Sequence, residues 1–364
     1  MIMNTPPLIV GMARTHGDGV TKDKILATAR AMADRGLVNA GYEYLNIGDG
    51  WAKKSRDPDT KSLVPDIEKL GGDLKGIADE LAKSGIKLGV VTSAGTKTPN
   101  GFPGSFGYEY EDARFLAESG VRLISHDLGS LPTRVDPVTM IRRMGMASRT
   151  ASSDMIYSVF SDGDVFRRMI RSTGAHLYHN RLFSRAAGVV PPPPETFGFS
   201  VPGSLFNCGE TVLSSTTDEA ELKRALVISS MASSPITVDA DITMLTDGEI
   251  SLLTDRDIIA VTKDRECRPA RLMSPFPEAV YLKVLDENRY AAAFVNCGDD
   301  AARLSLFAHD MGLTKDARRF VVAEEEAGGE RRFEFSDDLT VTLDPGESSL
   351  FFLRLEKMKG GAAK

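Results

Sequence analysis

The chain has 364 residues, enough for one large domain and a smaller one with a sizeable core. Apolar residues make up 42% of it and charged residues 26%, which is typical of a soluble globular protein. The net charge of -7 argues against nucleic acid or an anionic membrane as the main partner, and no apolar run is long enough to span a bilayer.

The N-terminus and the cysteines indicate the compartment. The first residues lack the basic start, the long apolar stretch and the small-residue cleavage site of a signal peptide. Cys208, Cys267 and Cys297 are too few and too scattered for a disulfide framework or a metal cluster. We therefore expect a cytoplasmic protein that needs no metal or other cofactor.

Short apolar runs alternate with amphipathic helical patterns through most of the chain. Eight runs are predicted to be strands: 7–12, 44–47, 86–91, 121–125, 155–160, 175–178, 204–207 and 235–238. Helices are predicted between them at 22–39, 74–84, 110–119, 137–148, 165–172 and 218–233. Apolar strands separated by helices indicate a parallel sheet covered on its faces, and eight such units predict a (β/α)8 TIM barrel.

After about residue 268 the pattern changes. Polar and apolar residues alternate there, with turn signals at 286–288 and 344–346, which predicts antiparallel β-sheet. We expect an α/β protein with a catalytic-type barrel at 1–267, a C-terminal β-sandwich at 268–356 and a disordered tail at 357–364. The proline run 191–194 predicts a stiff extended loop between the sixth and seventh strands.

Polar residues follow most of the predicted strands, at the end of a barrel where chemistry takes place. A single residue of this kind is most simply a helix cap, but four of the five histidines lie at predicted strand ends. The candidates in chain order are His16, Asp49, Trp51, Ser125, His126, Asp127, Asp162, His176, His179, Asp239 and Asp241.

Several segments resemble glycoside hydrolase family 27, the α-galactosidase and α-N-acetylgalactosaminidase-like enzymes. They are GYEYLNIGDGW at 41–51, the run at 84–120, RLISHD at 122–127 and the run at 234–264. The resemblance implies a barrel followed by a β-domain, and a retaining mechanism in which Asp127 is the nucleophile.

The resemblance also implies a divergent sugar site. Asp49 and Trp51 match a sequence whose aspartates bind the 4- and 6-hydroxyls of the sugar, with Gly48 in place of the first aspartate. Ser125 stands where the family has a sugar-binding lysine, while Arg171 keeps a family arginine. His16 is predicted to join these substrate-binding residues.

Retaining hydrolysis needs a second carboxyl group, about 5–5.5 Å from the nucleophile, to protonate the leaving oxygen. The resemblance places that acid/base at Ala175, which cannot transfer a proton. His176 beside it and Asp162 after the fifth strand are the candidate replacements. Two cysteines that the family has near the nucleophile are also missing, at Pro99 and within 128–130, which agrees with a reducing compartment.

Three functions remain open on the sequence. The first is a divergent glycoside hydrolase that acts on a small α-glycoside through Asp127. The second is a catalytically impaired pseudo-glycosidase that binds a carbohydrate. The third is a barrel with repurposed, histidine-based chemistry, in which a metal ion held by His16, His126, His176, His179 and Asp127 is one option. All three leave the identity of the glycoside and the oligomeric state open, a homodimer included.

Overall fold

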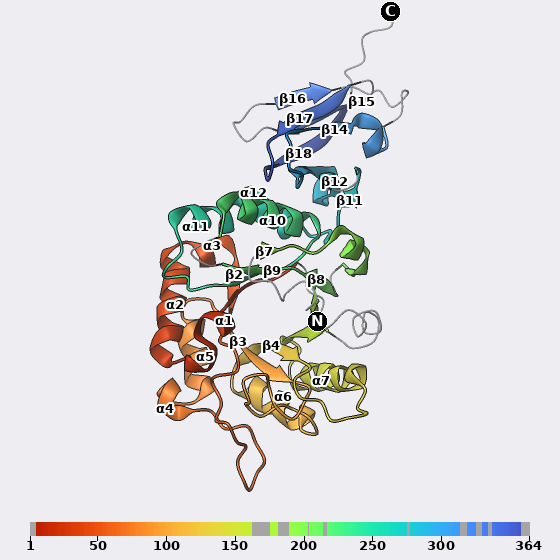
Figure 1. Cartoon of the computed structure of the whole chain (residues 1–364). Helices are drawn as coiled ribbons and strands as arrows, with labels where there is room; N and C mark the ends of the chain where they lie inside the picture. The colour runs from red at the N-terminus through yellow and green to blue at the C-terminus, as the bar shows by residue number, and fades with distance from the viewer. Residues whose placement is uncertain are drawn as a thin grey trace, which may run out of the picture.

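The computed structural model describes residues 5–161, 175–180, 189–202, 204–213, 217–274, 277–313, 319–324, 330–333 and 337–357. Parallel strands form a ring flanked by helices, and the C-terminal strands lie beyond helices α10 and α12 (Figure 1). The ring strands are β1 (Leu8–Gly11), β2 (Tyr42–Asn46), β3 (Lys87–Ser93), β4 (Val121–Asp127), β5 (Ile156–Ser161), β6 (Leu177–Asn180), β8 (Phe206–Cys208), β9 (Glu210–Val212) and β10 (Ile236–Asp239). The predicted parallel barrel is therefore confirmed.

The seventh barrel strand is interrupted. Its first part, β8, pairs in parallel with β6, and its second part, β9, pairs in parallel with β10. Only Gly209 separates the two parts, so one strand changes partner and links β6 to β10. β7 (Val189–Val190) pairs antiparallel with β9, and the proline run leads from it into the short 3-10 helix η2 (Pro194–Phe199).

Most of the described helices begin at a side chain that caps them. Asp73 accepts the backbone N–H of Gly76 at the start of α5, and Thr246 and Glu249 form a capping box on α11. The helices are α1 (Ala13–His16), α2 (Lys22–Asp34), α3 (Leu37–Ala40), α4 (Ile67–Leu70), α5 (Leu74–Ala82), α6 (Glu109–Glu118), α7 (Pro137–Ala151), α10 (Glu219–Met231), α11 (Asp247–Leu253) and α12 (Arg256–Thr262). The helix predicted at 165–172 lies outside the described residues.

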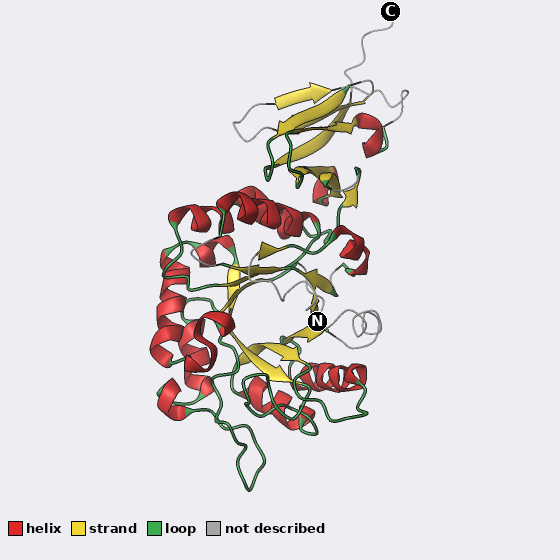
Figure 2. Ribbon diagram, viewed as in Figure 1, coloured by secondary structure: helices red, strands yellow, loops and turns green. Residues whose placement is uncertain are grey.

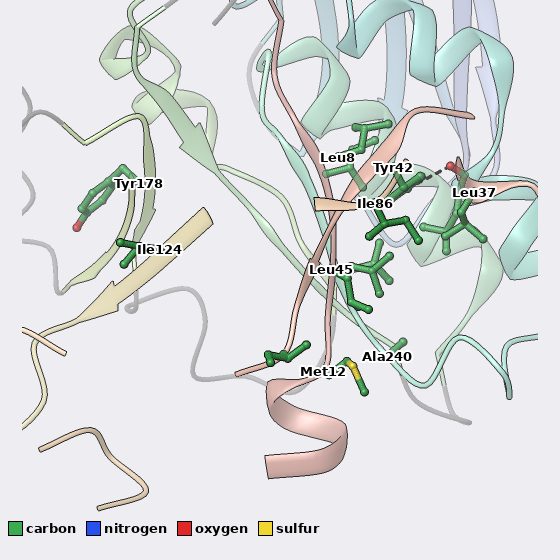
Figure 3. Packing of buried hydrophobic residues seen from close by; sticks show 14 of the residues in the cluster. Leu8, Met12, Leu37, Tyr42, Leu45, Ile86, Ile124, Tyr178 and Ala240 are labelled. Atoms are coloured by element: carbon green, nitrogen blue, oxygen red, sulfur yellow. Dashed lines mark hydrogen bonds between the residues drawn. The ribbon is translucent and has the colours of Figure 1, made fainter. Parts of the chain in front are cut away.

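Alternation along the strands separates two apolar layers. Side chains that point away from the barrel axis, such as Leu8, Leu45 and Ile124, pack beneath the helices in the largest cluster (Figure 3). A second cluster joins residues of six strands that can meet only inside the barrel: Ile9, Tyr44, Leu123, Ile156, Leu177, Phe206 and Cys208, together with Cys267. This alternation separates the strand residues that point into the barrel from those that point towards the helices.

The C-terminal strands form antiparallel sheets (Figure 2). A six-stranded sheet has the order β11-β12-β13-β18-β15-β16, and β14 pairs with β17 in a second sheet. The bounds are β11 (Arg271–Leu272), β12 (Glu278–Val284), β13 (Arg289–Asn296), β14 (Ala302–Phe307), β15 (Arg319–Glu324), β16 (Glu330–Phe333), β17 (Asp338–Leu343) and β18 (Ser348–Lys357).

Both faces of the six-stranded sheet are buried. Val280 and Phe294 pack on β14 and β17, whereas Tyr281, Ala293 and Leu350 belong to the same cluster as the barrel core. The junction with the barrel also buries a lysine. Lys283 is fully buried, and its Nζ donates to the carbonyl oxygens of Ser230 (2.7 Å), in α10, and Val261 (2.8 Å), in α12. Burial lowers the pKa of Lys283 to about 7.

Within the described part of the chain, no helix combines the length and the apolar character needed to cross a bilayer.

Candidate active site

Asp127 ends β4 at the carboxyl-terminal mouth of the barrel. It pairs with Ser93, the last residue of β3, and shares the inward face of its strand with Leu123 and Ser125. Its side chain is 4% exposed, and its carbonyl oxygen accepts the backbone N–H of Ala94 at 2.7 Å. The residue therefore presents a buried carboxylate on the inner wall of the mouth, the position at which barrel enzymes carry their catalytic groups.

Backbone hydrogen bonds join the loops that follow β3 and β4. The N–H of Ser130 donates to the carbonyl of Lys97 (3.1 Å), and the N–H of Thr96 donates to the carbonyl of Ser130 (3.0 Å). Gly129 has a φ of +49°, and a Cβ atom there would collide with Ser93 Oγ and the Lys97 carbonyl. Close packing and hydrogen bonds thus hold the two loops together where the resemblance implied a cysteine pair.

Asp49, in the loop after β2, is held by the loop after β3. Its Oδ2 accepts from Thr98 Oγ1 (2.6 Å) and its Oδ1 from Asn100 Nδ2 (3.0 Å). A carboxylate has about four acceptor positions, so each oxygen keeps capacity for one more donor. Asp49 remains available to a ligand hydroxyl while it fixes the two loops to each other.

Ser125 lies one layer below Asp127 on the inner face. Its Oγ accepts from Asn46 Nδ2 at 2.8 Å, and Asn46 Oδ1 accepts the N–H of Gly48 at 3.2 Å. The short serine is therefore part of a network between β2 and β4, in place of the longer cationic side chain that the resemblance implies.

Trp51 does not line the mouth as predicted. Its side chain is 2% exposed, belongs to the outer core and stacks on Phe115 of α6 with ring centroids 6.4 Å apart. The prediction of a sugar contact for Trp51 is therefore corrected, because an indole packed beneath a helix cannot reach the barrel interior.

His16 lies at the rim, in α1, directly after β1. Its Nδ1 is 2.8 Å from Thr15 Oγ1. Partial burial and nearby Lys24 lower the pKa of His16, whereas Asp241, in the loop after β10, raises it. Two of the predicted strand-end residues, His16 and Asp241, are thus close enough to interact.

His176 and Ala175 lie at the wrong end of the barrel for the role predicted. Both precede β6, whereas the mouth lies at its carboxyl end, after Asn180. The Nδ1 of His176 accepts the backbone N–H of Tyr157, near the start of β5, at 3.0 Å. His176 is therefore excluded as an acid/base at the mouth, and Ala175 does not mark that position either. Asp162 and Arg171 lie outside the described residues.

The remaining barrel histidines face opposite ways. His126 points outward, with its Nδ1 2.6 Å from Thr92 Oγ1 and its ring against Tyr157. His179 points inward and stacks on Phe160. Burial lowers the pKa of each to about 3. Among the described residues, no group of three or more His, Cys, Asp or Glu side chains is arranged to hold a metal ion.

Asp239 is an inward carboxylate that ends β10. Its two oxygens each lie 3.2 Å from the backbone N of Arg14. The carboxylate packs against Gly11, where a Cβ atom would lie 3.2 Å from Asp239 Oδ2. Burial raises the pKa of Asp239, opposed by the N–H of Arg14. The sequence identifies Asp239 only as the end of a strand. Its alternation with the inward Thr237, which pairs with Ile9, separates it from Asp241 in the loop that follows.

Comparisons with known proteins agree with this arrangement. The alpha galactosidase A family model matches residues 13–169. "Probable alpha-galactosidase B" of Aspergillus oryzae is 42% identical over 118 residues, which make up 32% of this chain and only 27% of that protein. Alpha-galactosidase A of Cellvibrio japonicus is 27% identical over 317 residues, covering 82% of this chain and 78% of that one. The crystal structure of alpha-galactosidase I from Mortierella vinacea superposes with a TM-score of 0.85 at 22% identity, covering 97% of each chain.

The parallel barrel followed by a C-terminal antiparallel domain is thus a fold that the chain shares with this solved structure. Residues 13–169 of the chain are similar to the alpha galactosidase A family, and the chain spans only about a quarter of the length of the first relatives it matches.

Proposed function

We propose that the protein is a divergent retaining glycosidase that cleaves a small α-glycoside with Asp127 as its nucleophile. The observation that carries this proposal is the placement of Asp127 as a buried, inward carboxylate at the mouth end of β4. Asp49, Ser125 and the polar rim around His16 supply further groups for sugar hydroxyls. A cytoplasmic setting belongs to the same proposal, since none of Cys208, Cys267 and Cys297 forms a disulfide bond.

The proposed reaction has two displacements. A carboxylate oxygen of Asp127 attacks the anomeric carbon, the bond from that carbon to the leaving oxygen breaks, and a glycosyl ester forms. Water then attacks the same carbon, breaks the ester bond and restores the carboxylate. Each displacement inverts the anomeric carbon, so two displacements preserve the α-configuration. The leaving oxygen gains one proton and the attacking water loses one, so the protons balance.

The proton donor is the divergent part of this site. The sequence that follows β6, from Arg181 to Pro194, contains no aspartate, glutamate or histidine. General acid catalysis is typically worth 10²–10⁴-fold in rate. We therefore propose that the enzyme prefers leaving groups that depart without protonation, unless Asp162 supplies the proton.

A carbohydrate-binding protein without turnover is the second candidate. The same absence of an acidic side chain between Arg181 and Pro194 favours it. The internal hydrogen bonds of Asp49 also stabilise its carboxylate without a substrate. Binding of a sugar with no hydrolysis of any α-glycoside would be its signature.

The two candidates separate on an activated substrate. 2,4-Dinitrophenyl α-galactoside needs no acid catalyst, whereas methyl α-galactoside does. We therefore expect the ratio of the two turnover rates to be larger than in glycosidases that have a proton donor. Asp127→Ala should abolish turnover, and added azide should restore release of dinitrophenol by giving the β-glycosyl azide. Equal residual rates in wild type and Asp127→Ala would remove Asp127 from the reaction.

A further inference from the structure

Three neighbouring strands present polar side chains to the barrel interior beside Asp127. Ser125 pairs with Ser158 of β5, and Phe160 of β5 pairs with His179 of β6. Ile156 and Leu177 belong to the interior cluster, so alternation puts Ser158, Phe160 and His179 on the inner face. A continuous inner wall thus runs from the nucleophile position to β6.

Two polar atoms of this wall have no hydrogen-bond partner in the described structure. They are Ser158 Oγ and His179 Nδ1, on side chains that are 1% and 3% exposed. A buried polar atom without a partner costs about 1–3 kcal/mol, so such atoms are rare unless something else satisfies them. Both lie on the inner face, Ser158 one layer below the mouth beside Ser125 and His179 level with Asp127.

An aromatic contact fixes the imidazole. The rings of Phe160 and His179 are stacked with centroids 4.2 Å apart and planes 11° from parallel. Phe160 itself is only half-buried. The pair therefore offers one apolar ring surface and one polar edge, a combination that suits a sugar ring with its C–H faces and hydroxyl groups.

The charge state of His179 decides what it can do. Burial lowers its pKa to about 3, so the imidazole is neutral at physiological pH. A neutral imidazole can donate one hydrogen bond and accept another, but it cannot serve as the missing general acid. Its role must therefore be recognition of a hydroxyl and not protonation of the leaving oxygen.

We propose that the stacked Phe160 and His179 form the β5–β6 wall of the sugar site, where His179 hydrogen bonds to a hydroxyl of the bound sugar unit. This inference rests on the proposed function, because it assumes that a monosaccharide unit of an α-glycoside occupies the mouth. Strands lie roughly 5 Å apart, so Asp127 of β4 and His179 of β6 stand about 10 Å apart at the backbone, with Phe160 on the strand between them.

The chain supplies a matched control for the test. His126 is as buried as His179 and has a similarly lowered pKa, but it faces the helices. In the Asp127→Asn background, we expect His179→Gln to weaken galactose binding about tenfold by calorimetry, as loss of one hydrogen bond implies. His126→Gln should leave the dissociation constant unchanged even if it lowers the melting temperature.

A second measurement needs no substitution in the site. With only five histidines, the imidazole nitrogens can be followed by NMR during a galactose titration. His179 resonances should shift and those of His126 should not. Unshifted His179 signals, or equal affinities in both glutamine variants, would overturn the proposed contact and leave an ordered water as its partner.

The outcomes also separate this contact from the proposed catalysis. Galactose binding that depends on His179, with no turnover of the dinitrophenyl substrate, would support the His179 contact and contradict the proposed hydrolysis. Turnover that depends on Asp127 but not on His179 would support the hydrolysis and contradict the contact. Absence of any galactose binding or turnover in the wild-type protein would overturn both.

Discussion

Arg56 holds the long loop between β2 and α4 against the barrel, and its removal gives a measurable prediction. Its guanidinium makes two hydrogen bonds to the Asp112 carboxylate, at 2.8 and 2.6 Å, and one to the Gly104 carbonyl at 2.7 Å. It also lies 4.3 Å from the centre of the Tyr108 ring. The Asp112 side chain is only 1% exposed, so the pair is a buried one.

Arg56→Met should lower the free energy of unfolding by about 3–5 kcal/mol, because it leaves the Asp112 carboxylate buried without its counter-charge. Burial already raises the pKa of Asp112, opposed by Arg56. Without Arg56 that pKa rises further above its unfolded value. The deficit is therefore largest at neutral pH and shrinks as the pH falls into the acidic range, where Asp112 takes up a proton in the folded state.

Urea unfolding can be followed through Trp51, the single tryptophan of the chain, which is buried close to this loop. Asp112→Asn in the Arg56→Met background should recover part of the loss, since it removes the stranded charge. Lys75→Met, which breaks an exposed pair with Asp79, is the matched control and should cost less than about 1 kcal/mol. A deficit for Arg56→Met that is equally small, or independent of pH, would refute the reasoning.

Two further predictions concern the mouth loops and the domain junction. Gly129→Ala should destabilise the protein by more than about 1 kcal/mol and reduce sugar affinity, because its φ of +49° and the contact with Lys97 leave no room for a Cβ; unchanged thermal melting and galactose affinity would contradict this. The pKa of Lys283 falls from 10.5 to about 7 on folding, so the folded state binds fewer protons between these values and stability should rise with pH across them, by up to about 5 kcal/mol. Lys283→Met should flatten that rise in urea titrations from pH 7 to 10; an identical slope in both proteins would exclude the lysine as its source.

The barrel was predictable because its strands are short apolar runs that need no tertiary information to recognise. Each of the eight predicted strands overlaps an observed one, and the family resemblance at Asp127 agrees with its position at the end of β4. The seventh strand is a partial exception. A partner change at Gly209 depends on which neighbours are within reach, and no local pattern encodes it.

The site was harder to predict because strand ends were uncertain by about two residues. The sixth strand was expected at 175–178 and lies at Leu177–Asn180, which moves His176 from the mouth to the opposite end. The sequence also leaves open whether His126 and His179 point into the barrel or towards the helices. Their alternation with Leu123 and Leu177 gives the answer only once these two leucines are known to lie in the barrel interior.

Trp51 shows a different limit. In the sequence, a tryptophan after a barrel strand is equally compatible with a contact to the sugar and with a place in the core. The structure shows the second, because Phe115, from a helix more than sixty residues away in the chain, packs on the indole ring.

The six-stranded sheet has a consequence for how this chain can be divided. Tyr281, Ala293 and Leu350 on its inner face are sealed by the barrel, and the Lys283 ammonium ties the ends of α10 and α12 to β12. Cutting the chain after Cys267 would expose an apolar surface on both pieces and leave two helix ends uncapped. The sheet thus covers part of the barrel's exterior, so we expect that neither part of the chain is stable when it is expressed without the other.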